Sequence, residues 1–168
     1  MYKKTIASII FIILSIIIFK CNYKEIMYQS ENYSNLDINF KNTIDIPSMR
    51  IKEVYNIQSI KKTSIKGIVM FYEYGRPNIK YSNTIVGAHS GVGINVYFNK
   101  LNTLILGDVI KIIYDNKLYE YIVYDKLEID ENNMSVLKKV ENRTILTLIT
   151  CKRSNPSKRI IVLCELID

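Results

Sequence analysis

From Ile46 to the C-terminus, the sequence consists of short runs of β-branched and aromatic residues separated by Gly, Asn, Asp and Pro. Such runs are typical of strands joined by turns, because branched and aromatic side chains suit a half-buried pleated surface. About seven or eight short strands with few helices predict a mainly-β fold, a closed or nearly closed seven- or eight-stranded β-barrel, since closure removes exposed sheet edges. We expect the strands at residues 49–55, 65–72, 83–88, 109–114, 118–127, 144–150 and 159–167.

The clearest hairpin surrounds the turn-forming sequence Asp-Asn-Lys at residues 115–117. An alternating apolar run lies on each side of it, which is the pattern of two antiparallel strands joined by a tight turn. Only two short helical segments are expected, at residues 96–101 and 134–140, with Asn133 placed to cap the second.

An uncharged, Ile-rich run extends from Thr5 to Phe19 and ends at Lys20. A helix of this length rises about 22 Å, less than the roughly 30 Å of a hydrocarbon core, but flanking Lys side chains can snorkel and extend the span. The large residues at its end offer no signal-peptide cleavage site, which needs small residues. Lys20 directly before Cys21 also breaks the small-residue pattern that lipidation of this cysteine requires. We therefore predict an uncleaved membrane anchor.

Lys3 and Lys4 precede this anchor, so the positive-inside rule places the N-terminus in the cytoplasm. Everything after Lys20 then lies outside the cell, and the protein is expected in the cell membrane as a single-pass chain. The length of 168 residues suits one domain with a real core. The predicted organisation is a cytoplasmic tip and membrane anchor at 1–21, a flexible extracellular linker at 22–45 and a folded barrel domain at 46–168.

The net charge of +7 is concentrated at the N-terminal end. Four Lys residues precede the first acidic residue, Glu25, which leaves +3 for the rest of the chain (7 − 4 = 3). No stripe of Arg with interleaved aromatic residues is present, so a nucleic-acid partner is not expected. A single His and three Cys also argue against a His-rich metal site and a dense disulfide scaffold.

Cys151 ends an apolar predicted strand and is followed by a polar, basic loop, a setting that favours a thiolate. If the strands on either side of this loop form an antiparallel hairpin with Cys151 opposite Arg159, the two side chains share one face. Cys164 then lies about 17 Å along the second strand, so a disulfide with Cys151 is not expected. Cys164 is better explained as a small core residue.

His89 follows a predicted strand and lies in a turn flanked by Gly87 and Gly91. Because it is the one His of the chain, chemistry that needs an imidazole must use it. Taken alone, either His89 or Cys151 is more often structural than reactive. Together with Arg159 they supply a nucleophile, a proton shuttle and a charge stabiliser, which are the groups that covalent acyl transfer needs.

At these residues the sequence resembles the sortases, the membrane-anchored cysteine transpeptidases of Gram-positive bacterial surfaces. Thr147 to Cys151 match the family signature Thr-Leu-x-Thr-Cys, and Arg159 opens a strand of the form Arg-Ile-Ile-Val. The family's His usually follows Gly directly, whereas here the order is Gly-Ala-His at residues 87–89. The resemblance runs from about Ile46 to the end and also includes Ile46-Pro47, Gly67-Ile68-Val69 and the Gly-Arg-Pro turn at 75–77.

The resemblance implies a sortase-type barrel in which His89, Cys151 and Arg159 are catalytic and the neighbouring Thr150 and Ser90 bind substrate. The implied substrates are secreted proteins with a C-terminal sorting signal of the Leu-Pro-x-Thr-Gly type, and the implied acceptor is the amine of a peptidoglycan precursor. No cofactor and no metal are expected. The interval from His89 to Cys151 is too short for the class B helical insertion, and no class C lid is visible, which leaves a class A-like or class D-like enzyme.

Two alternatives to a transpeptidase stay open on the sequence. A catalytically inactive surface β-barrel that binds a wall component or a partner protein would have an unreactive Cys151. A simple cysteine peptidase would use the same nucleophile and base, but its hydrolysis would not respond to an added amine.

Overall fold

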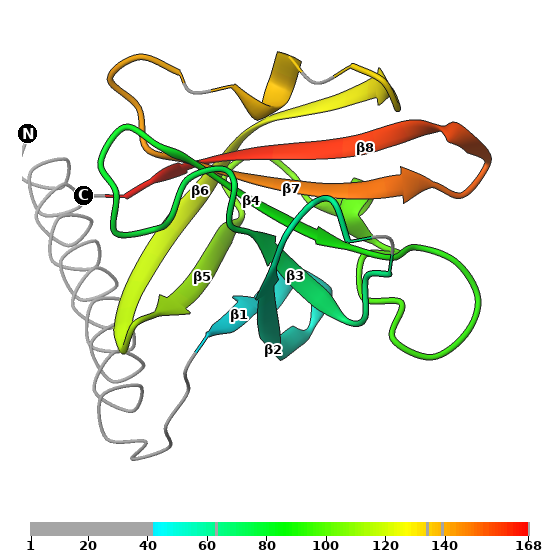
Figure 1. Cartoon of the computed structure of the whole chain (residues 1–168), viewed down its shortest axis with the longest axis horizontal. Coiled ribbons are helices and arrows are strands. Elements are labelled where there is room, and N and C mark those ends of the chain that lie inside the picture. The colour runs from blue at the N-terminus through cyan, green and yellow to red at the C-terminus, as the bar shows by residue number, and fades with distance from the viewer. Residues whose placement is uncertain (1–41, 63, 134, 139, 168) are drawn as a thin grey trace, which may run out of the picture. The chain divides into compact units, whose positions relative to one another are not determined.

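A computed structural model describes residues 42–62, 64–133, 135–138 and 140–167, which form a closed barrel of eight strands (Figure 1). The strands follow one another around the barrel in the order β1-β2-β3-β4-β7-β8-β6-β5. Their bounds are β1 Thr43–Ile46, β2 Ile51–Gln58, β3 Ile68–Phe71, β4 Asn83–Ala88, β5 Val109–Tyr114, β6 Lys117–Asp130, β7 Ile145–Lys152 and β8 Asn155–Leu166. Three short 3-10 helices are η1 Pro47–Met49, η2 Leu101–Thr103 and η3 Ser135–Leu137.

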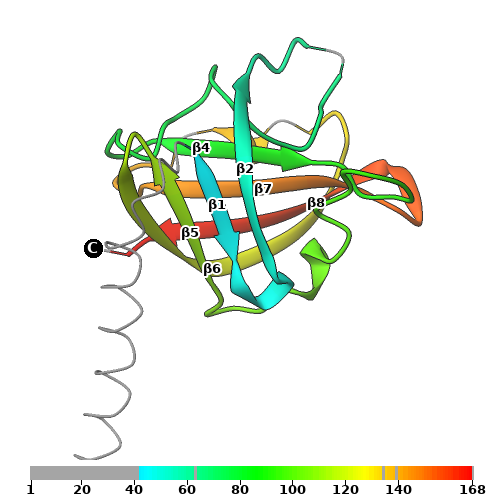
Figure 2. The ribbon, with the colours of Figure 1, turned by 90° about the horizontal axis from the view of Figure 1, so that it is seen from below.

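The barrel closes where β1 pairs with β5. It contains both parallel and antiparallel strand pairs. The β2–β3 and β4–β7 pairs are parallel, and the other neighbouring pairs are antiparallel. Figure 2 shows β4, β7 and β8 crossing behind β1 and β2. β4 is buried along its whole length, as expected for a central strand covered on both faces.

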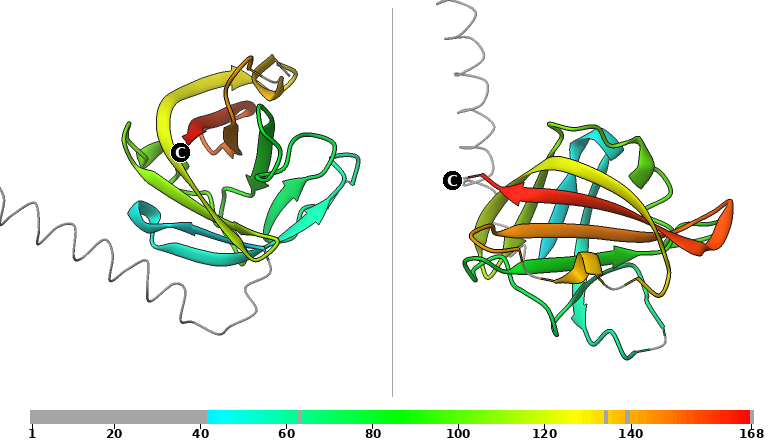
Figure 3. Two further views of the ribbon diagram at one scale, coloured as in Figure 1. Left: turned by 90° about the vertical axis from the view of Figure 1, so that its left-hand side faces the viewer. Right: turned by 90° about the horizontal axis from the view of Figure 1, so that it is seen from above.

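Figure 3 shows the strands curving around the interior of the barrel. The main apolar core lies in this interior, where alternate residues of each strand point inward. β7 contributes Leu146 and Leu148 to it, and β8 contributes Val162 and Cys164. Cys164 is fully buried, and its burial raises the pKa of the thiol. The expectation that Cys164 is a core residue is therefore confirmed.

The mainly-β barrel fold is confirmed, and the strands predicted at 83–88 and 109–114 have the predicted bounds. Each of the other predicted strands overlaps an observed one. The predicted helical segment 134–140 contains the 3-10 turn η3, whereas the segment 96–101 meets η2 only at Leu101. The C-terminal end of the predicted linker at 22–45 is wrong, because β1 begins at Thr43 and Ile44 is fully buried. Only two apolar residues separated by Asp45 mark this strand, which is too short a pattern to detect.

Among the described residues, no helix has the length and apolar character needed to cross a membrane. The predicted anchor at 1–21 and residues 22–41 of the predicted linker lie outside the described residues.

Candidate active site

The β7–β8 hairpin places Cys151 directly opposite Arg159, which confirms the register predicted from the sequence. Beyond this pair the register shifts, and Lys152 pairs with Asn155 across the Arg153-Ser154 turn. The shift leaves an irregular segment at residues 156–158 of β8, where Pro156 cannot donate a ladder hydrogen bond. Both strands of this hairpin project together from the barrel (Figure 1).

Cys151 and Arg159 belong to the outer face of the hairpin. Side chains alternate between the two faces of a strand, and Leu148 and Val162 point into the barrel interior. Cys151 is three residues beyond Leu148, so it follows the phase of Ile149, which packs on a second apolar cluster outside the interior. The buried members of this outer cluster are Val69, Phe71, Ile85 and Leu137.

His89 reaches the same end of the sheet from β4. The parallel β4–β7 ladder pairs Gly87 with Ile149, and His89 and Cys151 each lie two residues further along their own chains. Because neighbouring strands are about 4.8 Å apart, the continued register brings His89 and Cys151 to adjacent positions. Both side chains are exposed, and the Nε2–H of His89 donates a hydrogen bond of 3.0 Å to the carbonyl oxygen of Ile65.

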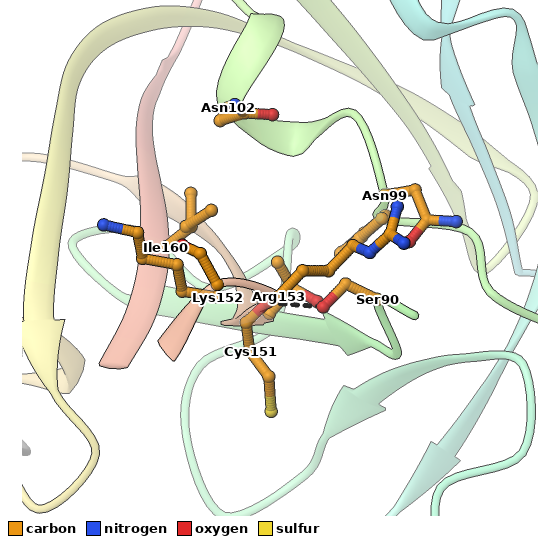
Figure 4. A pocket seen from close by; sticks show the side chains of 10 residues that line it. Ser90, Asn99, Asn102, Cys151, Lys152, Arg153 and Ile160 are labelled. Carbon is orange, nitrogen blue, oxygen red and sulfur yellow. Dashed lines mark hydrogen bonds between the residues drawn. The ribbon is translucent and has the colours of Figure 1, made fainter. Parts of the chain in front are cut away.

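Thr150 and Ser90 tie the two strand ends together. The Thr150 hydroxyl is buried and donates a 2.7 Å hydrogen bond to the carbonyl oxygen of Ala88. The Ser90 hydroxyl donates in the opposite direction, to the carbonyl oxygen of Cys151 (Figure 4). These two bonds hold the backbone of Cys151 against the residues that flank His89, which gives the predicted site a rigid frame.

The guanidinium of Arg159 is fixed on the β6 side of the hairpin. Its Nη2 donates to Oε2 of Glu131 over 2.9 Å, and its Nη1 donates to the carbonyl oxygens of Pro156, at 2.7 Å, and Lys158, at 3.1 Å. The side chain of Arg159 is about one quarter exposed. The orientation of the Arg159 guanidinium is therefore fixed by carbonyl groups of its own strand, and its positive charge is paired with the Glu131 carboxylate.

A pocket of about 450 Å³ adjoins Cys151 on the other side of the hairpin. It lies between the hairpin and the β4–η2 connection, and neither His89 nor Arg159 lines it. In Figure 4 the sulfur of Cys151 points away from Asn102, so the thiol lies at the edge of this pocket. The lining residues are Ser90, Phe98, Asn99, Asn102, Thr150, Cys151, Lys152, Arg153, Ser154 and Ile160.

Most of these lining residues were not predicted as site residues from the sequence, among them Asn99, Asn102 and Arg153. Asn102 lies in η2, and Asn99 lies shortly before it. Both are far from Cys151 in the chain, and no motif or period connects them to it. Arg153 follows Cys151 closely and was visible as part of the basic loop. Among the described residues, no group of three or more His, Cys, Asp or Glu side chains could hold a metal ion.

The comparisons with known proteins agree with this geometry. The family model described as "Sortase domain" matches residues 44–167. Sortase A from Corynebacterium diphtheriae, a lid mutant, superposes with a TM-score of 0.70 at 21% identity, over 82% of this chain and 75% of that one. Sortase C-1 from Actinomyces oris gives a TM-score of 0.70 at 25% identity, over 83% and 80%.

A third similar structure is sortase C from Clostridium perfringens with the C-terminal cell wall sorting motif. Its TM-score is 0.66 at 24% identity, over 75% of this chain and 69% of that one. The search of curated proteins found no match.

Proposed function

Since this chain belongs to the sortase family and is therefore a cysteine transpeptidase, we propose that Cys151, His89 and Arg159 carry out its reaction on a C-terminal sorting signal. The signal is of the Leu-Pro-x-Thr-Gly type and ends a secreted protein. The product is that protein joined to the amine of a cell-wall precursor. Residues 46–168, extended back to Thr43 by β1, form the catalytic domain.

The first half of the reaction breaks a peptide bond and forms a thioester. The thiolate of Cys151 attacks the carbonyl carbon of the signal Thr, and the C–N bond to the following Gly breaks. His89 protonates the departing amine. Because Nε2 of His89 is held by the Ile65 carbonyl, Nδ1 is the atom that exchanges this proton. Arg159 binds the substrate backbone or the developing oxyanion, and Ser90 and Thr150 hold the strand ends against the substrate.

The second half of the reaction reverses the roles. The acceptor amine attacks the thioester carbonyl, His89 removes its proton, and the Cys151 thiolate leaves. A thioester retains enough energy to acylate an amine, which explains why this chemistry uses a cysteine. Cys164 takes no part, because it is buried in the barrel interior.

The apolar run from Thr5 to Phe19 is proposed to anchor the enzyme in the cell membrane, with the N-terminus in the cytoplasm. Residues 22–42 would then link the anchor to an extracellular barrel. Such an anchor confines the enzyme, the secreted substrate and a lipid-linked precursor to one membrane face, which raises their effective concentration without a new contact.

The observation that carries this proposal is that His89 and Cys151 lie side by side in the register of β4 and β7, each two residues beyond the last pair, Gly87 and Ile149. The test uses the full-length chain in detergent micelles, a sorting-signal peptide and an amine acceptor. We expect wild-type protein to give the peptide–amine product by mass spectrometry and Cys151→Ala to give neither cleavage nor transfer.

Cys164→Ala is the matched control and should retain transfer, because Cys164 lies in the interior away from the site. Product formation by Cys151→Ala would contradict the assignment. Cleavage that ignores the added amine would favour the peptidase. A Cys151 that neither turns over peptide nor reacts with an alkylating probe would favour the inactive barrel.

A further inference from the structure

The pocket beside Cys151 lies on the opposite face of the β7–β8 hairpin from the outer surface that carries the thiol. Thr150 and its partner Ile160 line it, and both follow the phase of the residues that point into the barrel. The pocket therefore opens at the end of the barrel, on the opposite side of the hairpin from Arg159. A volume of about 450 Å³ lies within the range of sites for small ligands.

Basic groups dominate the charge of this pocket. Lys152 and Arg153 both line it, and none of its lining residues is acidic. Lys152 is already paired, since its Nζ lies 2.6 Å from Oε2 of Glu128. Arg153, in contrast, has no hydrogen-bond or ion-pair partner anywhere in the described part of the chain.

The turn that carries Arg153 also directs its side chain. Arg153 is the first of the two turn residues between Lys152 and Asn155. In Figure 4 its side chain extends toward the side of the pocket formed by Ser90 and Asn99. The side chain of Asn99 is oriented in turn, because its Oδ1 accepts a 2.6 Å hydrogen bond from the backbone N–H of Gly91.

We propose that this pocket binds a carboxylate and that Arg153 is the residue that selects it. A planar guanidinium without an internal partner offers paired donors that match the two oxygens of a carboxylate. Asn102 and Ser154 add neutral polar groups beside it. The inference rests on the proposed function, because it identifies Arg153 as a specificity residue of the same transpeptidation.

Two reactants could bring the carboxylate: the sorting signal, through an acidic residue at its variable position, or the acceptor, through a carboxylate close to its amine. The experiment therefore has two arms, each with a charged and a neutral member. One arm compares Leu-Pro-Glu-Thr-Gly with Leu-Pro-Gln-Thr-Gly peptides. The other compares diglycine with diglycine amide as the acceptor, using the neutral peptide.

The measured quantity is the ratio of kcat/KM for the charged and neutral members, with full-length protein in detergent micelles. We expect wild-type protein to favour the carboxylate by about tenfold or more in one arm, since hydrogen bonds to a charged group are strong. Arg153→Gln should reduce that ratio to within about twofold of one, and Arg153→Glu should invert it. Arg50→Gln removes another exposed arginine, at the end of η1, and should keep the wild-type ratio.

Equal use of both members in both arms by an active wild-type enzyme overturns the inference and leaves the proposed function intact. A preference that survives Arg153→Gln overturns it as well. If the wild-type protein shows no turnover, the proposed function fails, and binding of the same four compounds to Cys151→Ala decides the inference. In that case an Arg153-dependent preference for the carboxylate supports it, and its absence overturns it.

Discussion

At the scale of single residues, the environment of Arg159 shows why a planar side chain is needed at this position. One guanidinium nitrogen bonds Glu131 while another bonds the Pro156 carbonyl, which fixes the head group without using all five of its N–H donors. A lysine at this position carries one ammonium and cannot hold these two partners and a substrate group in the same fixed geometry.

Arg159→Lys should therefore lower kcat/KM for a sorting-signal peptide by at least about tenfold, which corresponds to the loss of one charge-assisted hydrogen bond. The variant should keep the wild-type thermal transition, because the exposed Arg159–Glu131 pair contributes little to stability. Peptide cleavage followed alongside a circular dichroism melt measures both quantities. Wild-type kcat/KM in the variant would remove Arg159 from the proposed mechanism.

Gly87 is a second residue whose identity the structure explains. A Cβ at this position would lie 2.9 Å from Cε2 of Phe71 and 3.5 Å from Cγ2 of Ile149. Gly87→Ala should lower the free energy of unfolding by about 1–3 kcal/mol, the usual range for overpacking. It should also lower activity, since Ile149 and His89 both adjoin the displaced backbone.

The measurement is a urea unfolding curve, and the informative partner variant is Phe71→Leu. If the clash is the cause, the double variant Gly87→Ala/Phe71→Leu loses less than the sum of the two single changes. Additive losses would point to a backbone effect at residue 87 instead.

At the scale of the elements, the β5–β6 hairpin turns through two residues in the left-handed region, with φ of 51° at Asp115 and 60° at Asn116. This is the backbone of a type I′ turn, which Asn, Asp and Gly tolerate and β-branched residues do not. Asn116→Val should lower the free energy of unfolding by about 1–2 kcal/mol. Asn116→Gly should leave it unchanged or raise it, and thermal melts of the two variants give the comparison.

The elements that could be predicted from sequence are those whose signal is local. The hairpin at 115–117 was predicted because its turn residues and flanking alternation lie within a few positions of one another. The register of Cys151 with Arg159 was predicted correctly because both residues flank one short loop. β1 was missed because its two buried Ile residues give no extended pattern.

The remaining features depend on pairings between distant segments. Glu131 meets Arg159 only because β6 pairs with β8, and Asn99 and Arg153 line one pocket because β4, which precedes Asn99, pairs with β7. The sequence therefore predicted the three proposed catalytic residues, but it could not predict the direction of the Arg159 side chain or the pocket on the other face of the hairpin.

At the scale of the whole molecule, the ion pair between Arg143 and Glu165 links the end of the β6–β7 connection to the C-terminal strand. Arg143 donates from Nε and Nη2 to the two carboxylate oxygens of Glu165, at 2.9 and 2.6 Å, and its guanidinium lies 4.0 Å from the ring centre of Tyr124. Hydrogen bonding to Arg143 lowers the pKa of Glu165 below its usual value. The pair therefore stabilises the fold when Glu165 is ionised.

A depressed folded-state pKa gives stability that is present above the unfolded pKa of about 4.3 and is lost as the pH falls through the folded value. Both side chains are about one third exposed, so after screening by solvent the contribution is about 0.5–1 kcal/mol. Between pH 7 and pH 3, wild-type protein should lose that much more stability than Glu165→Gln. Urea midpoints at the two pH values test this, and parallel losses in both proteins would show that the pair contributes nothing.

The closed form of the barrel depends on β1, the strand that the sequence did not predict. β1 pairs with β2 on one side and β5 on the other, and Ile44 and Ile46 are fully buried in the core. Burial of two such side chains contributes roughly 3–6 kcal/mol, a large part of the 5–15 kcal/mol by which domains are stable. Removing the strand would also leave β2 and β5 with unpaired edges.

A chain that begins at Pro47 should therefore show no cooperative unfolding transition, whereas a chain that begins at Asn42, just before β1, should unfold cooperatively. Differential scanning calorimetry of the two chains makes the comparison. A cooperative transition in the shorter chain would mean that the remaining strands close the barrel or tolerate its opening. Its absence, together with a cooperative transition in the longer chain, would place the beginning of the catalytic domain at β1 rather than at residue 46.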